Sequence, residues 1–225
     1  MLYGALEAGG TKMVLAVGES PGDIWHRTTL PTAGPEETLA AILAFFTKHD
    51  IAALGVGCFG PLDLNKNSPT WGHITSTPKL QWQNFPLAPA LAGALKVPVA
   101  MDTDVNGAAL AEHVLGAARG LSSCLYVTVG TGVGGGLVVE GNLVHGLVHP
   151  ELGHMLLRPR PEDPAPEGFC PYHGACLEGL ASGPAMEKRW GISSRELPRE
   201  HPAWALEAAY LGQMCANAVV TFSPE

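Results

Sequence analysis

The sequence predicts an α/β fold made of two related halves. Strand-like and helix-like segments alternate along the first half, which is typical of a sheet covered by helices. A glycine-rich turn between two apolar segments occurs twice, once in each half. The 225 residues are 46% hydrophobic and 15% charged, which suffices for a substantial core. We expect one domain at residues 1–116 and a second at residues 117–225.

Apolar patterning places the individual elements. Strands are predicted at Leu2–Leu6, Met13–Val17, Ile24–Thr29, Ile51–Gly57 and Val97–Asp102. Apolar residues at helical spacing predict helices at Pro35–His49, Leu87–Leu95 and Val105–Leu115. The second half restarts with strands at Cys124–Val129 and Gly135–Val139, then a proline-rich loop at Arg158–Tyr172 and helices at Leu177–Trp190 and Trp204–Phe222. This order implies a mixed sheet in the first half.

The charge balance and the cysteine count narrow the class of protein. Thirteen basic and twenty-one acidic residues give a net charge of −8, without any basic cluster. We therefore expect no nucleic-acid partner and no anionic membrane surface. The N-terminus resembles no signal peptide, and no apolar window is long enough to span a membrane. Five cysteines, two of them clustered with histidines, favour metal binding in a reduced, cytoplasmic enzyme.

Two glycine turns predict phosphate binding. The first glycine turn, defined here as Gly9, Gly10, Thr11 and Lys12, offers backbone amides, a hydroxyl and a positive charge to an anion. Glu7, at the end of the preceding strand, could hold Mg²⁺ through water. The second glycine turn is Gly130, Thr131 and Gly132; it has no Walker pattern and opens no helix, which excludes a dinucleotide fingerprint. Each turn alone could be a simple hairpin, but the pair favours an ATP clamp.

Two carboxylates follow the last strand of the first half. Asp102 and Asp104 lie where that strand ends and a helix begins, a usual place for a site in an α/β sheet. Phosphoryl transfer to an alcohol requires a carboxylate that orients the hydroxyl and accepts its proton. We expect one Asp to be this base and the other to cap or support the helix. Spacing alone leaves the choice open.

A cluster of histidines and cysteines predicts a zinc site. The candidate ligands are His154, Cys170, His173 and Cys176, of which the last three are closely spaced before a helical segment. Four protein ligands leave no open coordination position, so the metal is predicted to be structural. His145 and His149 are interpreted as ordinary loop residues.

These motifs together resemble the ROK family (repressors, open reading frames and kinases) of sugar kinases. The resemblance covers essentially the whole chain and rests on EAGGTK from Glu7, DTDVNGAALAE from Asp102, VTVGTGVGGG from Val127, HPELGH from His149 and CPYHGACLEGLASGPA from Cys170. The glutamate in EAGGTK and the CPYHG form of the zinc loop resemble the bacterial, zinc-containing fructokinase (mannofructokinase) branch. The resemblance implies a two-lobed, actin-like (ribonuclease H-like) ATPase fold.

The resemblance also implies roles for single residues. Asp104 matches the catalytic aspartate, and the two glycine turns match the ATP-phosphate sites. Sugar hydroxyls are expected to meet Glu151, His154 and Glu178, so that His154 serves both zinc and sugar. Gly60 and Pro61, together with the 77–82 loop, are expected to line the sugar mouth. The implied reaction is phosphorylation of D-fructose to fructose 6-phosphate with ATP and Mg²⁺, and mannose or glucose are possible secondary substrates.

Two departures from the family pattern stand out. Thr103 replaces an Asn that often precedes the catalytic Asp in glucose-preferring relatives, which fits a ketohexose preference. The family also continues beyond VTFSPE with a strand, a turn that helps hold adenosine, and final helices, so the second lobe is expected to be incomplete. A non-catalytic sugar-binding remnant is therefore one alternative. A sugar-sensing regulator of the same family is another, although the first strand begins at Leu2 without a preceding helix-turn-helix. By analogy we expect a homodimer.

Overall fold

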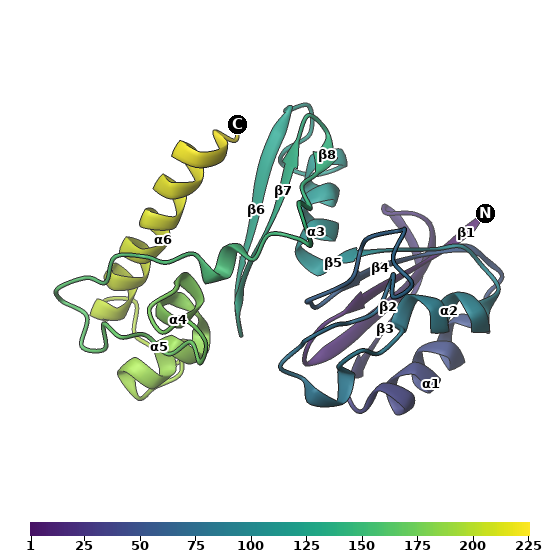
Figure 1. Cartoon of the computed structure of the whole chain (residues 1–225), viewed down its shortest axis with the longest axis horizontal. Helices are drawn as coiled ribbons and strands as arrows, with labels where there is room; N and C mark the ends of the chain where they lie inside the picture. The colour runs from purple at the N-terminus through teal and green to yellow at the C-terminus, as the bar shows by residue number, and fades with distance from the viewer. The chain divides into compact units, whose positions relative to one another are not determined.

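The structure is a computed structural model that describes all residues from Met1 to Glu225, and it divides into two compact units (Figure 1). The first unit consists of Met1–Ala108 and His145–His149. The second unit consists of Ala109–Val144 and Pro150–Glu225. The units therefore divide inside a helix, and the expected domain boundary at residues 116 and 117 stays a prediction.

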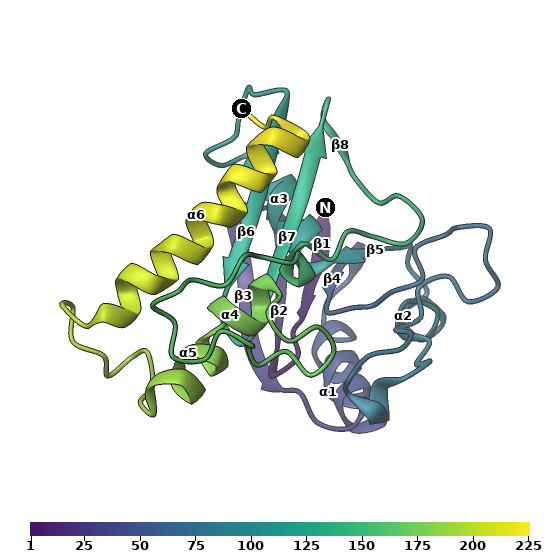
Figure 2. The same ribbon diagram turned by 60° about the vertical axis from the view of Figure 1, so that its left-hand side comes forward.

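The first unit contains a five-stranded mixed sheet. Its strands are β1 (Leu2–Ala8), β2 (Lys12–Ser20), β3 (Asp23–Pro31), β4 (Ile51–Cys58) and β5 (Val99–Thr103). They are arranged in the order β3-β2-β1-β4-β5 (Figures 1 and 2). The first three strands pair antiparallel, while β1, β4 and β5 run parallel. The mixed sheet expected from the sequence is confirmed, and each hairpin strand is longer than predicted because pairing continues into its turn.

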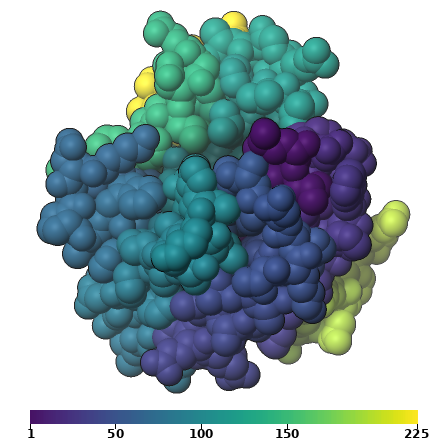
Figure 3. Space-filling view, turned by 90° about the vertical axis from the view of Figure 1, so that its right-hand side faces the viewer, coloured from purple at the N-terminus to yellow at the C-terminus, as the bar shows by residue number.

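Two helices of this unit contact each other, α1 (Pro35–Phe46) and α2 (Leu87–Leu95). Figure 3 shows the surface of the first unit, coloured by residue number. Pro35 in the first turn and two acidic residues, Glu36 and Glu37, suit the helix start. Helix α1 ends at Phe46 instead of the predicted His49, because the amides of Lys48 and His49 bond back three residues in a tighter turn. Buried side chains from sheet and helices form one core, which includes Leu6, Leu15, Ile42, Phe46 and Leu91.

The second unit joins a small sheet to a helical layer. Helix α3 (Asp104–Val114) starts in the first unit and ends in the second. The remaining elements are β6 (Ser123–Val129), β7 (Val133–Val139), β8 (Asn142–Leu143), α4 (Leu177–Ala181), α5 (Gly183–Trp190) and α6 (Pro202–Phe222). Short 3-10 turns lie at Leu80–Trp82 in the first unit and Leu152–His154 in the second. Leu177, Leu180, Leu206 and Tyr210 are fully or almost fully buried in the core of the second unit. No helix is long and apolar enough to cross a membrane.

The single helix predicted at Leu177–Trp190 is wrong, because it is two helices separated at Ser182. Ser182 has extended backbone, and its hydroxyl oxygen accepts a hydrogen bond from the amide of Ala185, which makes it the N-cap of α5. Pro184 occupies the first turn of α5, where a missing N–H costs nothing. The break frees the amide of Gly183, which donates to the carbonyl of Gly130 at 2.8 Å. The second glycine turn is thereby attached to the helical layer.

Candidate functional site

Three parallel strands of the first unit end in one row. Ala8 of β1 pairs with Cys58 of β4, and Cys58 pairs with Thr103 of β5. The residues that follow, Gly9 and Asp104 among them, therefore leave the same edge of the sheet. Sites in α/β folds form at this carboxyl edge. The first glycine turn and the Asp pair, 90 residues apart in the chain, are brought to one edge.

The two aspartates have different surroundings. Oδ1 of Asp102 accepts hydrogen bonds from the amide of Thr103 and from Nδ2 of Asn106, both at 2.8 Å. Oδ2 of Asp102 lies 2.7 Å from Nε2 of His145. Asp104 is half-buried, and its Oδ1 accepts from the amide of Val105 at 2.9 Å. Asp102 is thus a support for its neighbours.

Neither aspartate is the cap of α3. The hydroxyl oxygen of Thr103, which is buried, accepts from the amide of Asn106 at 3.2 Å and caps the helix. Burial raises the pKa of the nearby Cys58 thiol, and the negative charge of Asp104 raises it further. Asp104 lies close to the end of β4, since a Cβ built on Gly57 would be 3.4 Å from the Cα of Asp104.

Two histidines that the sequence leaves as loop residues take part in this edge of the first unit. His145 pairs with Asp102, as described above. Nε2 of His149 accepts a hydrogen bond from the amide of Leu62 at 3.2 Å. The same ring packs on Gly60, where a Cβ would lie only 3.1 Å from Cε1 of His149. Gly60 and Pro61 are joined by a cis peptide bond. Neither contact has a local sequence signal, because the partners are more than forty residues apart.

The first glycine turn is held in shape by its neighbours. The amide of Gly9 donates to the carbonyl of Lys12 at 3.0 Å, and the hydroxyl of Thr32 donates to the carbonyl of Gly9 at 2.7 Å. Lys12 and Glu7 are exposed, and Glu7 lies one residue from the end of β1. An exposed carboxylate beside a turn that can bind phosphate fits the way Mg²⁺ is held, with few protein ligands and several waters.

The second glycine turn carries a carboxylate. The amide of Val133 donates to Oε2 of Glu178 at 3.1 Å. A Cβ at Gly132 would lie 2.6 Å from the same oxygen, so a side chain at this position would displace the Glu178 carboxylate. The expected sugar residue Glu178 therefore lies against the expected phosphate residue Gly132. Gly130 and Thr131 instead line a cavity of the second unit.

A cavity of about 860 Å³ opens beside Gly130 and Thr131 within the second unit. Its wall is formed by α5, the following loop and α6, with Trp204 and Glu207 among the lining residues. Glu207 is only 8% exposed. Burial raises the pKa of Glu207 to about 7, although the charge of Arg189 opposes the shift. The cavity is large enough for a nucleoside.

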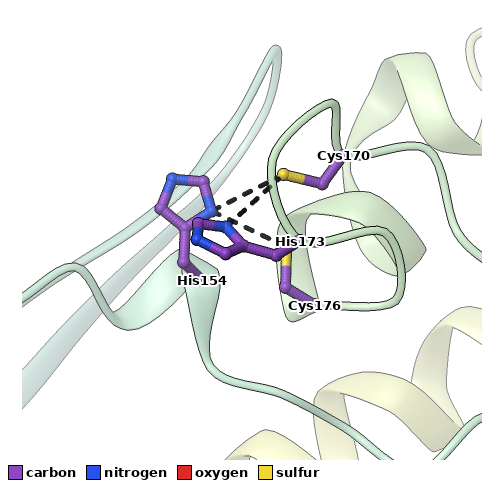
Figure 4. A group of neighbouring side chains, drawn as sticks. All are labelled: His154, Cys170, His173 and Cys176. Atoms are coloured by element: carbon purple, nitrogen blue, oxygen red, sulfur yellow. Dashed lines mark hydrogen bonds between the residues drawn. The ribbon is translucent and has the colours of Figure 1, made fainter.

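Four side chains of the second unit meet in the group that the sequence predicts as metal ligands (Figure 4). Sγ of Cys176 lies 3.6 Å from Nδ1 of His154, while Sγ of Cys170 lies 3.9 Å from that atom and 3.7 Å from Nδ1 of His173. All four ligand atoms lie within 4.8 Å of one another. A tetrahedral N/S site with ordinary bond lengths separates its ligands by about 3.3–3.8 Å. The donor set and its spacing fit a four-coordinate metal ion.

The local fold explains how this cluster forms. Cys170 and Gly174 bond to each other's backbone, which closes the loop that carries His173. Cys176 is the N-cap of α4, and burial raises the pKa of its thiol. His154 ends the 3-10 turn that follows Glu151, and its second ring nitrogen points away from both sulfurs (Figure 4). One ring can therefore serve a metal on one side and a ligand on the other.

Known proteins resemble this chain along its whole length. The model of the ROK family matches residues 3–225. A putative fructokinase of Bacillus subtilis (strain 168) is 46% identical over 224 residues, which cover 100% of this chain and 75% of that protein. A fructokinase of Zymomonas mobilis is 45% identical over 232 residues, which cover 100% of this chain and 77% of that protein. The chain thus spans about three quarters of these relatives.

A solved structure agrees with these relatives. The crystal structure of a ROK hexokinase from Thermus thermophilus matches with a TM-score of 0.79 and 34% sequence identity, covering 100% of this chain and 79% of that one. The match confirms the actin-like α/β fold expected from the sequence. The glycine turns, the Asp pair and the His/Cys cluster all lie inside the matched residues. This chain belongs to the ROK family of proteins.

Proposed function

We propose that this protein is an ATP-dependent fructokinase, which transfers the terminal phosphoryl group of ATP to D-fructose and yields fructose 6-phosphate. The observation that carries the proposal is the position of Asp104, at the sheet edge where the first glycine turn also begins. Relatives named fructokinase at 45% and 46% identity support the choice of sugar. Mannose and glucose are proposed as secondary substrates.

Asp104 is proposed as the general base. Its carboxylate orients the terminal hydroxyl of the sugar and accepts its proton as the oxygen bonds to phosphorus. The bond between the terminal phosphorus and the bridging oxygen breaks at the same time, and ADP leaves. Asp102 is less suited to this role, because three hydrogen-bonding groups already surround its two oxygens. We assign Asp102 to support Asp104.

The glycine turns are proposed to hold the nucleotide. The amides of Gly9 to Lys12 and of Gly130 to Gly132 would bind phosphate oxygens, where charge spreads in the transition state. The cavity beside Gly130 offers space for the nucleoside. Glu7 would hold Mg²⁺, and the bound ion would neutralise phosphate charge.

The sugar is proposed to bind Glu151, His154 and Glu178, with Gly60 and Pro61 at the mouth of its site. Zinc fits the four-residue cluster best, since two cysteines and two histidines are its usual structural ligands. The cluster fixes the ring of His154, so its second nitrogen would meet a sugar hydroxyl in a set orientation. Thr103 has its hydroxyl committed to the cap of α3 and would meet the sugar mainly through its shape. A homodimer in the cytoplasm is part of this proposal.

A coupled kinase assay with fructose, mannose and glucose tests the proposal. We expect turnover of fructose with Mg-ATP, and we expect Asp104→Asn to lower kcat at least 1,000-fold while sugar binding and metal content stay unchanged. Asp50→Asn, an exposed carboxylate at the end of the α1 region, serves as the matched control. Sugar binding without turnover in the unmodified chain would instead support the non-catalytic sugar-binding remnant or the sugar-sensing regulator.

A further inference from the structure

The side chain of Lys79 lies across the first glycine turn. A Cβ built on Gly10 would be 3.0 Å from Cε of Lys79 and 3.9 Å from its Nζ. Both residues belong to the first unit, yet 69 positions separate them in the chain. Because Gly10 has no Cβ, the side chain of Lys79 can lie against its backbone, and a ligand can also approach that backbone closely.

The backbone of Lys79 is firmly held. Its amide donates to the hydroxyl oxygen of Thr77 at 3.3 Å, and its carbonyl accepts from the amide of Trp82 at 2.8 Å. Thr77 and Trp82 are both buried. The indole nitrogen of Trp82 donates to the carbonyl of Ala33 at 3.0 Å, close to the strand that braces the first turn. These hydrogen bonds hold the backbone of Lys79 in place.

The ammonium group of Lys79 has no acidic partner in the chain. Lys79 takes part in none of the ion pairs found in the chain, which include those of Met1 with Glu19, Arg160 with Glu162, and Arg189 with Asp163. Lys79 is half-buried, and no carboxylate of the chain balances its charge. A cavity of about 320 Å³ adjoins the side chain, lined also by Thr32 and Gly34. An anion at the turn would satisfy this charge.

We propose that Lys79 binds the terminal phosphoryl group of the nucleotide, from across the turn that holds its other oxygens. This inference rests on the proposed function, and it adds a residue that the glycine-turn motif does not contain. The 77–82 loop, expected to line the sugar mouth, would then also deliver a positive charge to the group being transferred. A fixed cation at that group stabilises the charge on its oxygens in the transition state.

Two substitutions of Lys79 separate phosphate binding by its charge from packing by its methylene groups. Lys79→Met retains the methylene groups that cover Gly10, whereas Lys79→Arg retains the charge. We expect Lys79→Met to lower kcat/KM for ATP roughly 100-fold, with recovery in Lys79→Arg to within about 10-fold of the unmodified enzyme. The KM for fructose should change less than about 2-fold. Lys48→Met, an exposed lysine after α1, is the control.

The ratio of the affinities for two nucleotides tests the proposal further, because a purely structural role of Lys79 would not change this ratio. Lys79→Met should weaken binding of a non-hydrolysable ATP analogue at least 10-fold more than binding of ADP, because only the analogue carries the terminal phosphate. Equal losses for the two nucleotides, or no loss, would overturn the proposal. If the unmodified chain binds the analogue selectively through Lys79 but does not turn over fructose, the kinase proposal fails and the Lys79 contact stands. A chain that binds neither nucleotide overturns both.

Gly10→Ala provides a second, independent variant. The added Cβ would displace the Lys79 side chain by steric contact, so Gly10→Ala should lower kcat/KM for ATP in the same way. Residues in contact give non-additive effects. We therefore expect Gly10→Ala with Lys79→Met to cost little more than Lys79→Met alone, and fully multiplicative losses would contradict the proposed contact.

Discussion

Arg189 and Asp163 form an ion pair inside the second unit, with Nε of Arg189 donating to Oδ1 of Asp163 at 2.8 Å. Their side chains are 1% and 0% exposed. The hydroxyl of Tyr210 donates to Oδ2 of Asp163 at 2.5 Å, and Nη1 of Arg189 donates to the carbonyl of Leu180 at 2.8 Å. The Asp163 carboxylate thereby joins the proline-rich loop to α5 and α6, the helices that line the cavity beside the second glycine turn, and Arg189 extends the network to α4.

Asp163→Asn should destabilise the second unit strongly. The substitution leaves the buried charge of Arg189 without its partner, which typically costs about 3–5 kcal/mol of unfolding free energy. Glu162→Gln removes an adjacent carboxylate that is 54% exposed and pairs with Arg160, and it should change the free energy of unfolding far less, because water screens this pair. Urea denaturation of the two variants measures the difference. Similar losses of unfolding free energy in both variants would show that the buried pair of Arg189 and Asp163 does not stabilise the protein more than the exposed one.

Removal of the metal should loosen the sugar loop without abolishing the fold. We expect one zinc ion per chain by elemental analysis, and none in Cys176→Ser or after treatment with a strong chelator. Loss of the ion frees the ring of His154, so the KM for fructose should rise about 10-fold or more while the KM for ATP changes little. Cys215→Ser, at an exposed free cysteine on α6, should retain the metal. Absence of zinc from the unmodified chain would refute the assignment.

The sequence predicts those parts of the site whose signal is local. The glycine turns, the Asp pair after a strand and the close ligand triplet all lie within short segments, and the structure brings the Asp pair to the edge where the first turn begins. Ser182 shows the limit of such patterns, because apolar spacing continues through a position where capping by a serine ends one helix and starts another. His149 and Lys79 show another limit, since their partners Leu62 and Gly10 are distant in the chain and only the folded structure reveals them.

The contact of His149 predicts a graded effect of substitution. His149→Ala removes the acceptor for the Leu62 amide, and a buried amide left without a partner costs about 1–3 kcal/mol. The Gly60-Pro61 turn should then shift, and the KM for fructose should rise about 10-fold. His149→Gln offers an amide oxygen as a replacement acceptor and should recover most of the loss. Steady-state kinetics with both variants provide the measurement, and equal KM values for Ala and Gln would argue against the hydrogen bond.

Glu207 should make the stability of the second unit depend on pH. Burial raises its pKa to about 7 in the folded protein, against an ordinary value of 4.5. A carboxyl group with a raised pKa binds its proton more tightly in the folded state, so its contribution is complete below about pH 4.5 and is lost as the pH rises through 7. Allowing for partial solvent screening, we expect the unmodified protein to lose roughly 2 kcal/mol more than Glu207→Gln between pH 4 and pH 8. Urea denaturation at four pH values across this range, with both proteins, measures the difference. Parallel curves would show that the Glu207 carboxylate ionises inside the fold without cost, in which case the cavity beside Gly130 is better hydrated than its burial implies.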